Sequence, residues 1–243
     1  MPIQKFNADY HIKSYECDHS GRLRLLTLMN IFQDIADAHS TIMGVGIEHC
    51  LKNGLAWIGA QYLIEIENMP AWHEDIHICS WPAAEKKVGA VRDFIVTDNL
   101  KTPIIKASSL WILIDYNRKR PVCLRDHLPC YQAIEERVLD TDFPRLPDLE
   151  RCDFMTTFKI RYDDIDVNQH VNNAVYPLWA TESVPEDFRL KFQPQRLEVA
   201  FKKESLYGEN IRVETQIDGL LTLHCILSEK DNRELARIRI LWK

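Results

Sequence analysis

Residues 162–185 read YDDIDVNQHVNNAVYPLWATESVP and hold three polar side chains spaced two residues apart: Asp166, Asn168 and His170. A helix-like run through Val175 and Trp179 follows without a break. The start of a helix offers unpaired backbone N–H groups and the positive end of the helix dipole, which can polarise a carbonyl group or hold an anion. The segment therefore predicts a reaction centre.

Two other interpretations of this segment follow from spacing alone. Asp and Asn ahead of a helix often serve as caps and turn formers, and that alternative stays open. Asp164, Asp166 and Asn168 also match the first half of a calcium-binding loop. The second half does not fit, because Gln169 takes the glycine position and Val175 takes the position of the closing glutamate. We therefore predict no metal site.

The composition is typical of a globular protein with one large domain or two of about 120 residues. A formal net charge of −6, with acids and bases well mixed, disfavours nucleic acid or an anionic membrane as a partner. The N-terminal residues lack the apolar core of a signal peptide, and no later segment offers about 18 unbroken apolar residues. The seven cysteines never show two-residue metal-site spacing, which favours idle thiols in a reducing compartment. We expect a cytoplasmic protein.

Hydrophobic periodicity predicts the same order of elements twice, on either side of a proline-bearing connector. Before the connector we expect a strand at 10–16, a long helix at 25–44 and strands at 55–67, 75–80, 88–97 and 104–116. The connector covers 120–150, with a short helix near 132–138. After it we expect a strand at 154–162, a helix at 172–183 and strands at 195–203, 210–217, 220–228 and 234–242.

Two alignments in register indicate an internal duplication. Residues 62–78 lie over 197–213 at an offset of 197 − 62 = 135, and residues 10–22 lie over 158–170 at an offset of 158 − 10 = 148. The second alignment places Asp18, Ser20 and Arg22 opposite Asp166, Asn168 and His170. Only the second half keeps the complete polar set, so we expect the chemistry there.

The run DIDVNQHVNN, followed by Tyr-x-x-Trp and ESVP, resembles the signature of the acyl-acyl carrier protein thioesterases, the tandem hotdog enzymes of bacteria and plant plastids. The resemblance extends from Phe6 to Trp242. It implies an α+β fold, a tandem (double) hotdog in which two long helices are each wrapped by an antiparallel sheet and the two sheets are joined. The implied parts are an N-terminal hotdog half with the acyl-tail pocket (1–119), a linker (120–150) and a catalytic C-terminal hotdog half (151–243).

Site residues follow from the same resemblance. Asp166, Asn168 and His170 stand where the family has its catalytic Asp, Asn and His, and Glu204 in VAFKKES stands where the family has its water-activating base. The plant enzymes have a cysteine directly after that glutamate, whereas this chain has Ser205. We therefore expect direct attack by water on the thioester, with Glu204 as the base and His170 assisting.

The direction of the Glu204 side chain is not settled by the pattern. Leu197, Val199 and Phe201 form one apolar face, and strict alternation along the strand places Glu204 on the other face, as a solvated surface acid. A bulge or a strand end near residues 202–205 would redirect it. In the repeat Glu204 falls opposite Met69, so the first half also lacks the base.

The implied reaction is hydrolysis of fatty acyl-acyl carrier protein to free fatty acid, without a cofactor. The partner is the carrier protein with its acyl-phosphopantetheine. We expect the acyl tail to lie near Met29, Phe32 and Ile35, because the first helix is the longer and more apolar one, and we expect Lys202 and Lys203 to dock the carrier.

Three other functions are weighed against this one. An acyl-coenzyme A thioesterase would differ in its nucleotide pocket, which no sequence feature marks. A non-catalytic protein that binds acyl chains would not need the polar cluster. A hotdog hydratase pairs Asp and His five residues apart, whereas Asp166 and His170 are four apart. A homodimer is one expected oligomeric state.

Overall fold

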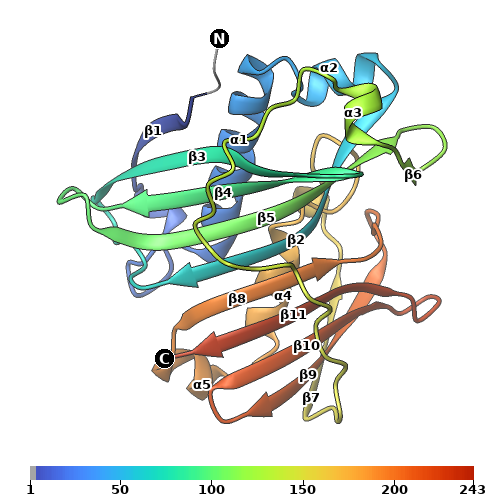
Figure 1. Ribbon diagram of the computed structural model, residues 1–243. Coiled ribbons are helices and arrows are strands. Elements are labelled where there is room, and N and C mark those ends of the chain that lie inside the picture. Colours follow the sequence, from blue (N-terminus) through green and yellow to red (C-terminus); the bar gives the residue numbers. More distant parts are fainter. Residues whose placement is uncertain (1–3) are drawn as a thin grey trace. The chain divides into compact units, whose positions relative to one another are not determined.

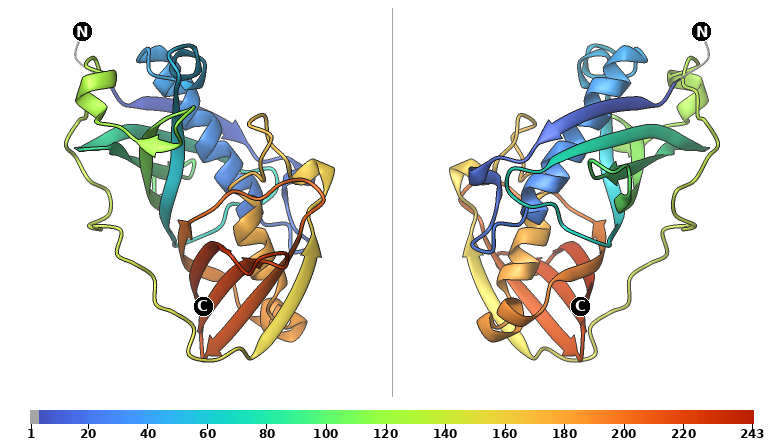
Figure 2. Two further views of the ribbon diagram at one scale, coloured as in Figure 1. Left: turned by 90° about the vertical axis from the view of Figure 1, so that its right-hand side faces the viewer. Right: turned by 90° about the vertical axis from the view of Figure 1, so that its left-hand side faces the viewer.

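The structure is a computed structural model that describes residues 4–243. The chain divides into two compact units, Met1–Phe143 and Pro144–Lys243. In each unit a helix packs against one face of that unit's own antiparallel sheet (Figures 1 and 2). Both units are therefore of the α+β class.

The sheet of the first unit has the strand order β1-β3-β4-β5-β2, and its neighbouring strands are antiparallel. The short β6 pairs with β5. The strands are β1 (Phe6–His11), β2 (Leu55–Ile66), β3 (Asp75–Lys86), β4 (Gly89–Thr97), β5 (Pro103–Asp115) and β6 (Arg120–Pro121). The predicted strands at 55–67, 88–97 and 104–116 are confirmed. β3 continues past its predicted end because a register shift between Pro82 and Ala84 accommodates the proline.

Helix α1 (Leu25–Ile42) covers one face of this sheet and confirms the predicted long helix. Its Phe32 ring stacks on Phe94 of β4, with the ring centroids 4.5 Å apart. Each large apolar side chain buried in this way stabilises the fold by about 1.5–3 kcal/mol. The buried apolar residues follow helical spacing: Leu28, Met29, Ile31, Phe32, Ile35 and Ala36. Two short helices, α2 (Ile47–Lys52) and α3 (Leu124–His127), were not predicted.

The second unit repeats the strand order of the first. Its sheet runs β7-β9-β10-β11-β8, so each strand takes the place of its counterpart in β1-β3-β4-β5-β2. The predicted duplication is thus confirmed. The elements are β7 (Phe154–Lys159), α4 (Val175–Glu182), α5 (Glu186–Lys191), β8 (Pro194–Phe201), β9 (Asn210–Asp218), β10 (Leu221–Ser228) and β11 (Glu234–Trp242).

The prediction of two long helices is wrong for the second unit, where α4 has only 8 residues. Its predicted start at 172 fails because the Asn172 side chain accepts a hydrogen bond from the backbone N–H of Ala174 at 2.9 Å, which makes a turn before the helix. Pro177 is tolerated because it lies in the first turn, where the missing N–H has no helical acceptor. The helix ends at Glu182 with Ser183 as its C-cap, and Pro185 is the N-cap of the next helix, α5.

The connector leaves the first sheet as an extended segment, so the short helix predicted near 132–138 does not form. The backbone N–H of Ile134 donates to the carbonyl of Pro82 at 2.9 Å. The backbone N–H of Val138 donates to the buried carboxylate of Asp93 at 2.6 Å. These contacts satisfy backbone groups that a helix would otherwise pair internally.

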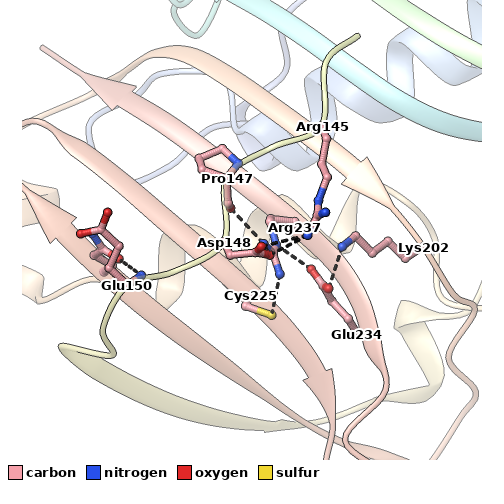
Figure 3. A network of polar contacts seen from close by, with 9 residues as sticks. Arg145, Pro147, Asp148, Glu150, Lys202, Cys225, Glu234 and Arg237 are labelled. Carbon is pink, nitrogen blue, oxygen red and sulfur yellow. Dashed lines mark hydrogen bonds and ion pairs between the residues drawn. The ribbon is translucent and has the colours of Figure 1, made fainter.

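Residues 144–150 are fastened to the sheet of the second unit by Arg237 of β11 (Figure 3). The Arg237 guanidinium is buried and donates to the Pro147 carbonyl at 3.0 Å, to the Asp148 carboxylate and to Glu234 at 2.6 Å. Glu234 in turn pairs with Lys202 at 2.6 Å. A buried guanidinium with carboxylate partners on two sides fixes the path of this segment.

Two expectations about the whole chain stay predictions: that the halves end at 119 and begin at 151, and that their two sheets join. No helix within residues 4–243 is long and apolar enough to cross a membrane.

Candidate active site

A tight turn between β7 and α4 brings Asp166, Asn168 and His170 together. The backbone N–H of Asp166 donates to the carbonyl of His170 at 2.9 Å, and Ile165 and Val171 form an isolated β-bridge on either side. Gln169 closes the turn with φ 65°, in the left-handed region that usually favours glycine. This turn therefore accounts for the placement of three polar residues that are spaced two apart in the sequence.

The carboxylate of Asp166 holds Asn168 in two ways. One oxygen accepts the Asn168 backbone N–H at 2.8 Å, and the other faces the Asn168 side-chain amide nitrogen at 3.4 Å. The Asn168 side chain is exposed. Neither residue forms the turn that leads into α4, which is made by Asn172. The helix-capping interpretation of Asp166 and Asn168 is therefore wrong, although Asp166 does shape a turn.

Glu204 faces His170, with its Oε2 atom 3.0 Å from His170 Nε2. The strand β8 ends at Phe201, and the backbone N–H of Lys202 donates to the carbonyl of Leu235 at 2.8 Å before the chain leaves the sheet. The alternation that would send Glu204 to the solvent face thus stops before residue 204. The side chains keep 29% exposure for His170 and 50% for Glu204, so water reaches both.

Ser205 lies under this pair and is buried. Its carbonyl accepts the backbone N–H of Val171 at 3.1 Å, which ties the Glu204 segment to the His170 turn. Its hydroxyl oxygen lies 2.8 Å from the hydroxyl of Tyr176 on α4. Burial raises the pKa of Tyr176 to about 12, so this phenol stays protonated at neutral pH. Sequence analysis missed Tyr176, because an aromatic residue on a buried helix face is usually part of the core.

The first unit contains the same turn without the reactive groups. Asp18 accepts the backbone N–H of Ser20 at 2.8 Å, and its own N–H donates to the carbonyl of Arg22 at 2.8 Å. Gly21, with φ 74°, takes the place of Gln169. The local geometry is therefore a property of the repeat, and the reactive side chains are added to it in the second unit alone.

The equivalence extends to the segment that carries Glu204. In the first unit the backbone N–H of Leu23 donates to the carbonyl of Pro70 at 2.9 Å, as Val171 does to Ser205. Met69 and Pro70 thus hold the places of Glu204 and Ser205, as the offset of 135 predicts.

The remaining predicted site residues are not part of this cluster. Met29, Phe32 and Ile35 are buried on α1 in the first unit. Lys202 is paired with Glu234, and Lys203 is exposed beside Glu204. Within residues 4–243, no group of three or more His, Cys, Asp or Glu side chains is arranged to hold a metal ion.

Two family models together match most of the chain. Residues 3–129 match the acyl-ACP thioesterase N-terminal domain, and residues 148–243 match the acyl-ACP thioesterase C-terminal domain. The boundary between the matched regions lies in the connector.

Plant chloroplast proteins are similar over nearly the whole sequence. A palmitoyl-acyl carrier protein thioesterase of Cuphea hookeriana is 28% identical over 98% of this chain and 62% of its own length. The oleoyl-acyl carrier protein thioesterase 2 of Arabidopsis thaliana is also 28% identical, over 98% of this chain and 76% of its own length. This chain thus spans only about three-fifths of the first of these relatives.

Solved structures share the fold. An acyl-ACP thioesterase from Bacteroides thetaiotaomicron superposes with a TM-score of 0.89 at 21% identity, covering 98% of both chains. A 12:0-ACP thioesterase from Umbellularia californica gives a TM-score of 0.87 at 23% identity, covering 100% of this chain and 99% of its own. These likenesses establish the double-hotdog fold for this sequence.

Proposed function

Because this chain belongs to the acyl-ACP thioesterase family, we propose that it hydrolyses the thioester of a fatty acyl-acyl carrier protein to a free fatty acid and the carrier's thiol. The observation that supports this most directly is the 3.0 Å contact between His170 Nε2 and Glu204 Oε2 beside the Asp166 turn. A half-exposed carboxylate next to an imidazole can accept a proton from water and pass it on. The first unit has the turn but neither group, so the pair is not a requirement of the fold.

In the proposed reaction Glu204 takes a proton from a water molecule, and the water oxygen bonds to the thioester carbonyl carbon. The tetrahedral intermediate then collapses, the C–S bond breaks and the thiolate leaves. His170, in contact with Glu204, takes this proton from Glu204 and gives it to the thiolate. The hydroxyl group of the water thus ends in the fatty acid and its proton on the thiol, and the Glu204 carboxylate is restored.

The exposed side-chain amide of Asn168 is the proposed donor to the oxyanion. A donor set in place before the reaction stabilises charge as it develops, and losing one costs on the order of 3 kcal/mol. The hydrogen bonds that Asn168 donates to the Asp166 carboxylate supply that fixed position. Asp166 therefore acts by holding Asn168 in place.

The substrate side of the proposal has two parts. The acyl tail lies against α1 near Met29, Phe32 and Ile35, and the carrier with its acyl-phosphopantetheine docks near Lys203, with Lys202 assisting. The apolar character of α1 supports the first part, and the position of the lysines next to Glu204 supports the second. A homodimer and a cytoplasmic location stay predictions.

The test compares three thioesters: acyl-acyl carrier protein, acyl-coenzyme A and an enoyl thioester. We expect thiol release to be fastest from the carrier-bound substrate and to fall by roughly 10²- to 10⁴-fold in Glu204→Ala. Faster release from coenzyme A would favour the alternative thioesterase, and loss of the enoyl double bond would indicate a hydratase. Binding of the acyl chain without thiol release would show a non-catalytic binder.

A further inference from the structure

Arg233, at the turn between β10 and β11, contacts the segment that carries Glu204 at two points. Its Nη2 atom lies 3.5 Å from the Glu204 carbonyl oxygen and 3.2 and 3.4 Å from the two carboxylate oxygens of Glu209. The same Glu209 carboxylate accepts the backbone N–H of Leu206 at 3.1 Å. One guanidinium and one carboxylate therefore fasten residues 204–209.

The first unit shows which part of this arrangement the fold requires. Glu74 stands at the place of Glu209 and accepts the backbone N–H of Ala71 at 2.9 Å, so the carboxylate belongs to the turn. Thr102 stands at the place of Arg233, because Asp98 N–H donates to its carbonyl at 3.1 Å, as Ser228 N–H does to Arg233 at 3.0 Å. The turn thus forms without an arginine at this position.

The two units hold the corresponding carbonyl from different positions. In the first unit Arg22, at the place of His170, donates to the carbonyl of Met69 at 2.9 Å. In the second unit that place is taken by His170, whose imidazole faces the Glu204 carboxylate and does not hold its carbonyl. In the second unit the guanidinium comes from Arg233 instead. Position 170 can therefore hold an imidazole.

One nitrogen of the Arg233 side chain is left unsatisfied. Its Nε atom is buried and has no hydrogen-bond partner within residues 4–243. A buried N–H without a partner costs about 1–3 kcal/mol. The guanidinium does offset the negative charge that gathers here, since it lies against Glu209 and its Nη1 atom is 3.3 Å from the Asp231 carboxylate.

We propose that Arg233 is a positioning residue that holds the Glu204 segment so that the Glu204 carboxylate stays against His170. This inference rests on the proposed role of Glu204 as the base. A displacement of about 1 Å in such a group can cost up to roughly 100-fold in rate.

The test is a double-mutant cycle on kcat with acyl-acyl carrier protein as substrate. Arg233→Met should lower kcat by roughly 10- to 100-fold with little change in KM, and Arg233→Lys should recover part of the loss. In a Glu204→Gln background Arg233→Met should have almost no further effect, because the group that it positions is gone. Arg151→Met is the matched control, since Arg151 pairs with Asp153 and Asp218 at the opposite end of β9 and should leave kcat unchanged.

The outcomes separate the two proposals. If Glu204→Gln keeps wild-type kcat, the proposed base is wrong and the inference falls with it. If Glu204→Gln is inactive while Arg233→Met keeps wild-type kcat, only the positioning role is wrong. Equal losses from Arg233→Met in both backgrounds would show an effect independent of Glu204. Should Arg233→Met fail to fold, Arg233→Lys carries the same cycle.

Discussion

The hydroxyl oxygen of Ser205 lies 2.8 Å from the hydroxyl of Tyr176, and both side chains are buried. Ser205 directly follows the proposed base Glu204, so the partner of its hydroxyl decides what it can do. A hydroxyl paired with a protonated phenol has no base to remove its proton. Its contacts are those of a structural residue between the Glu204 segment and α4.

We expect Ser205→Ala to keep kcat within about threefold of wild type while losing about 1–3 kcal/mol of unfolding free energy, because the Tyr176 hydroxyl loses its partner. Glu204→Ala should fold normally and lose roughly 10²- to 10⁴-fold in kcat. Urea unfolding beside steady-state kinetics separates the two. A trapped acyl-enzyme on Ser205, seen by mass spectrometry, would overturn the water mechanism.

The Asp166 turn has a natural control in the first unit. Asp166→Asn should lower both stability and kcat, because it weakens the bond to the Asn168 backbone N–H and the hold on the amide. Asp18→Asn should lower stability by a similar amount and leave kcat unchanged, since Asp18 holds Ser20 in the same way. Asn168→Ala should mainly lower kcat. Thermal melts beside kcat values test all three, and a kcat loss in Asp18→Asn would contradict the division of roles.

Local patterns could be predicted from the sequence, whereas directions set by distant partners could not. The turn from Asp166 to His170 is closed by hydrogen bonds within its own backbone, so the two-residue spacing of its polar residues could be recognised in the sequence. Helix α1 follows the apolar spacing of its own residues. The direction of Glu204 depends on where β8 stops, and that depends on a bond between Lys202 and Leu235 of β11.

Tyr176 and Arg233 show the same limit. Each one is placed by a residue about thirty positions away, Tyr176 by Ser205 and Arg233 by Glu204. On pattern alone the first is a core aromatic residue and the second a surface charge. The signal that could have found Arg233 is the internal repeat, because Thr102 at the corresponding position has no charge.

The proposed acyl-tail site is tested by filling it. Met29 and Ile35 are buried on the inner face of α1, so Met29→Trp or Ile35→Trp must take space from a bound chain or from the core. We expect shorter fatty acids among the products, because each methylene excluded from burial costs about 0.8 kcal/mol, or roughly fourfold in preference. Asp34→Trp, on the exposed face of the same helix, is the control. An unchanged product spectrum with retained activity would remove the acyl tail from this helix.

Carrier docking is best tested at Lys203. Lys202→Glu would also break the 2.6 Å pair with Glu234 and disturb the hydrogen bonds of Arg237, whereas Lys203 forms no ion pair within residues 4–243. Lys203→Glu should raise KM for acyl-acyl carrier protein more than for a short pantetheine thioester, and the difference should shrink at high salt. Lys106→Glu, an exposed lysine in β5, controls for net charge. Equal KM changes on both substrates would point to damage at Glu204.

We expect acid to destabilise the protein, because two of its histidines are buried. Within residues 4–243 His224 bonds only hydroxyl groups, those of Ser183, Thr215 and Thr222, and burial lowers its pKa to about 3. Burial and then the neighbouring Arg92 lower the pKa of His39 to about 4. Both groups are therefore neutral in the native protein at pH values where an unfolded chain binds the proton.

The sign follows from linkage. Below about pH 6.5 the unfolded state gains protons that the native state excludes. The contribution of the two histidines to the unfolding free energy is therefore fully present above that pH and is lost as the pH drops toward 4 and 3. Each histidine contributes a slope of up to about 1.4 kcal/mol per pH unit. His224→Gln should be less stable than wild type at pH 8, because it replaces a buried, hydrogen-bonded side chain. It should lose less stability between pH 7 and pH 4, because glutamine does not titrate. Urea midpoints across that range provide the measurement. A His224→Gln slope equal to wild type would show that His224 does not carry the effect.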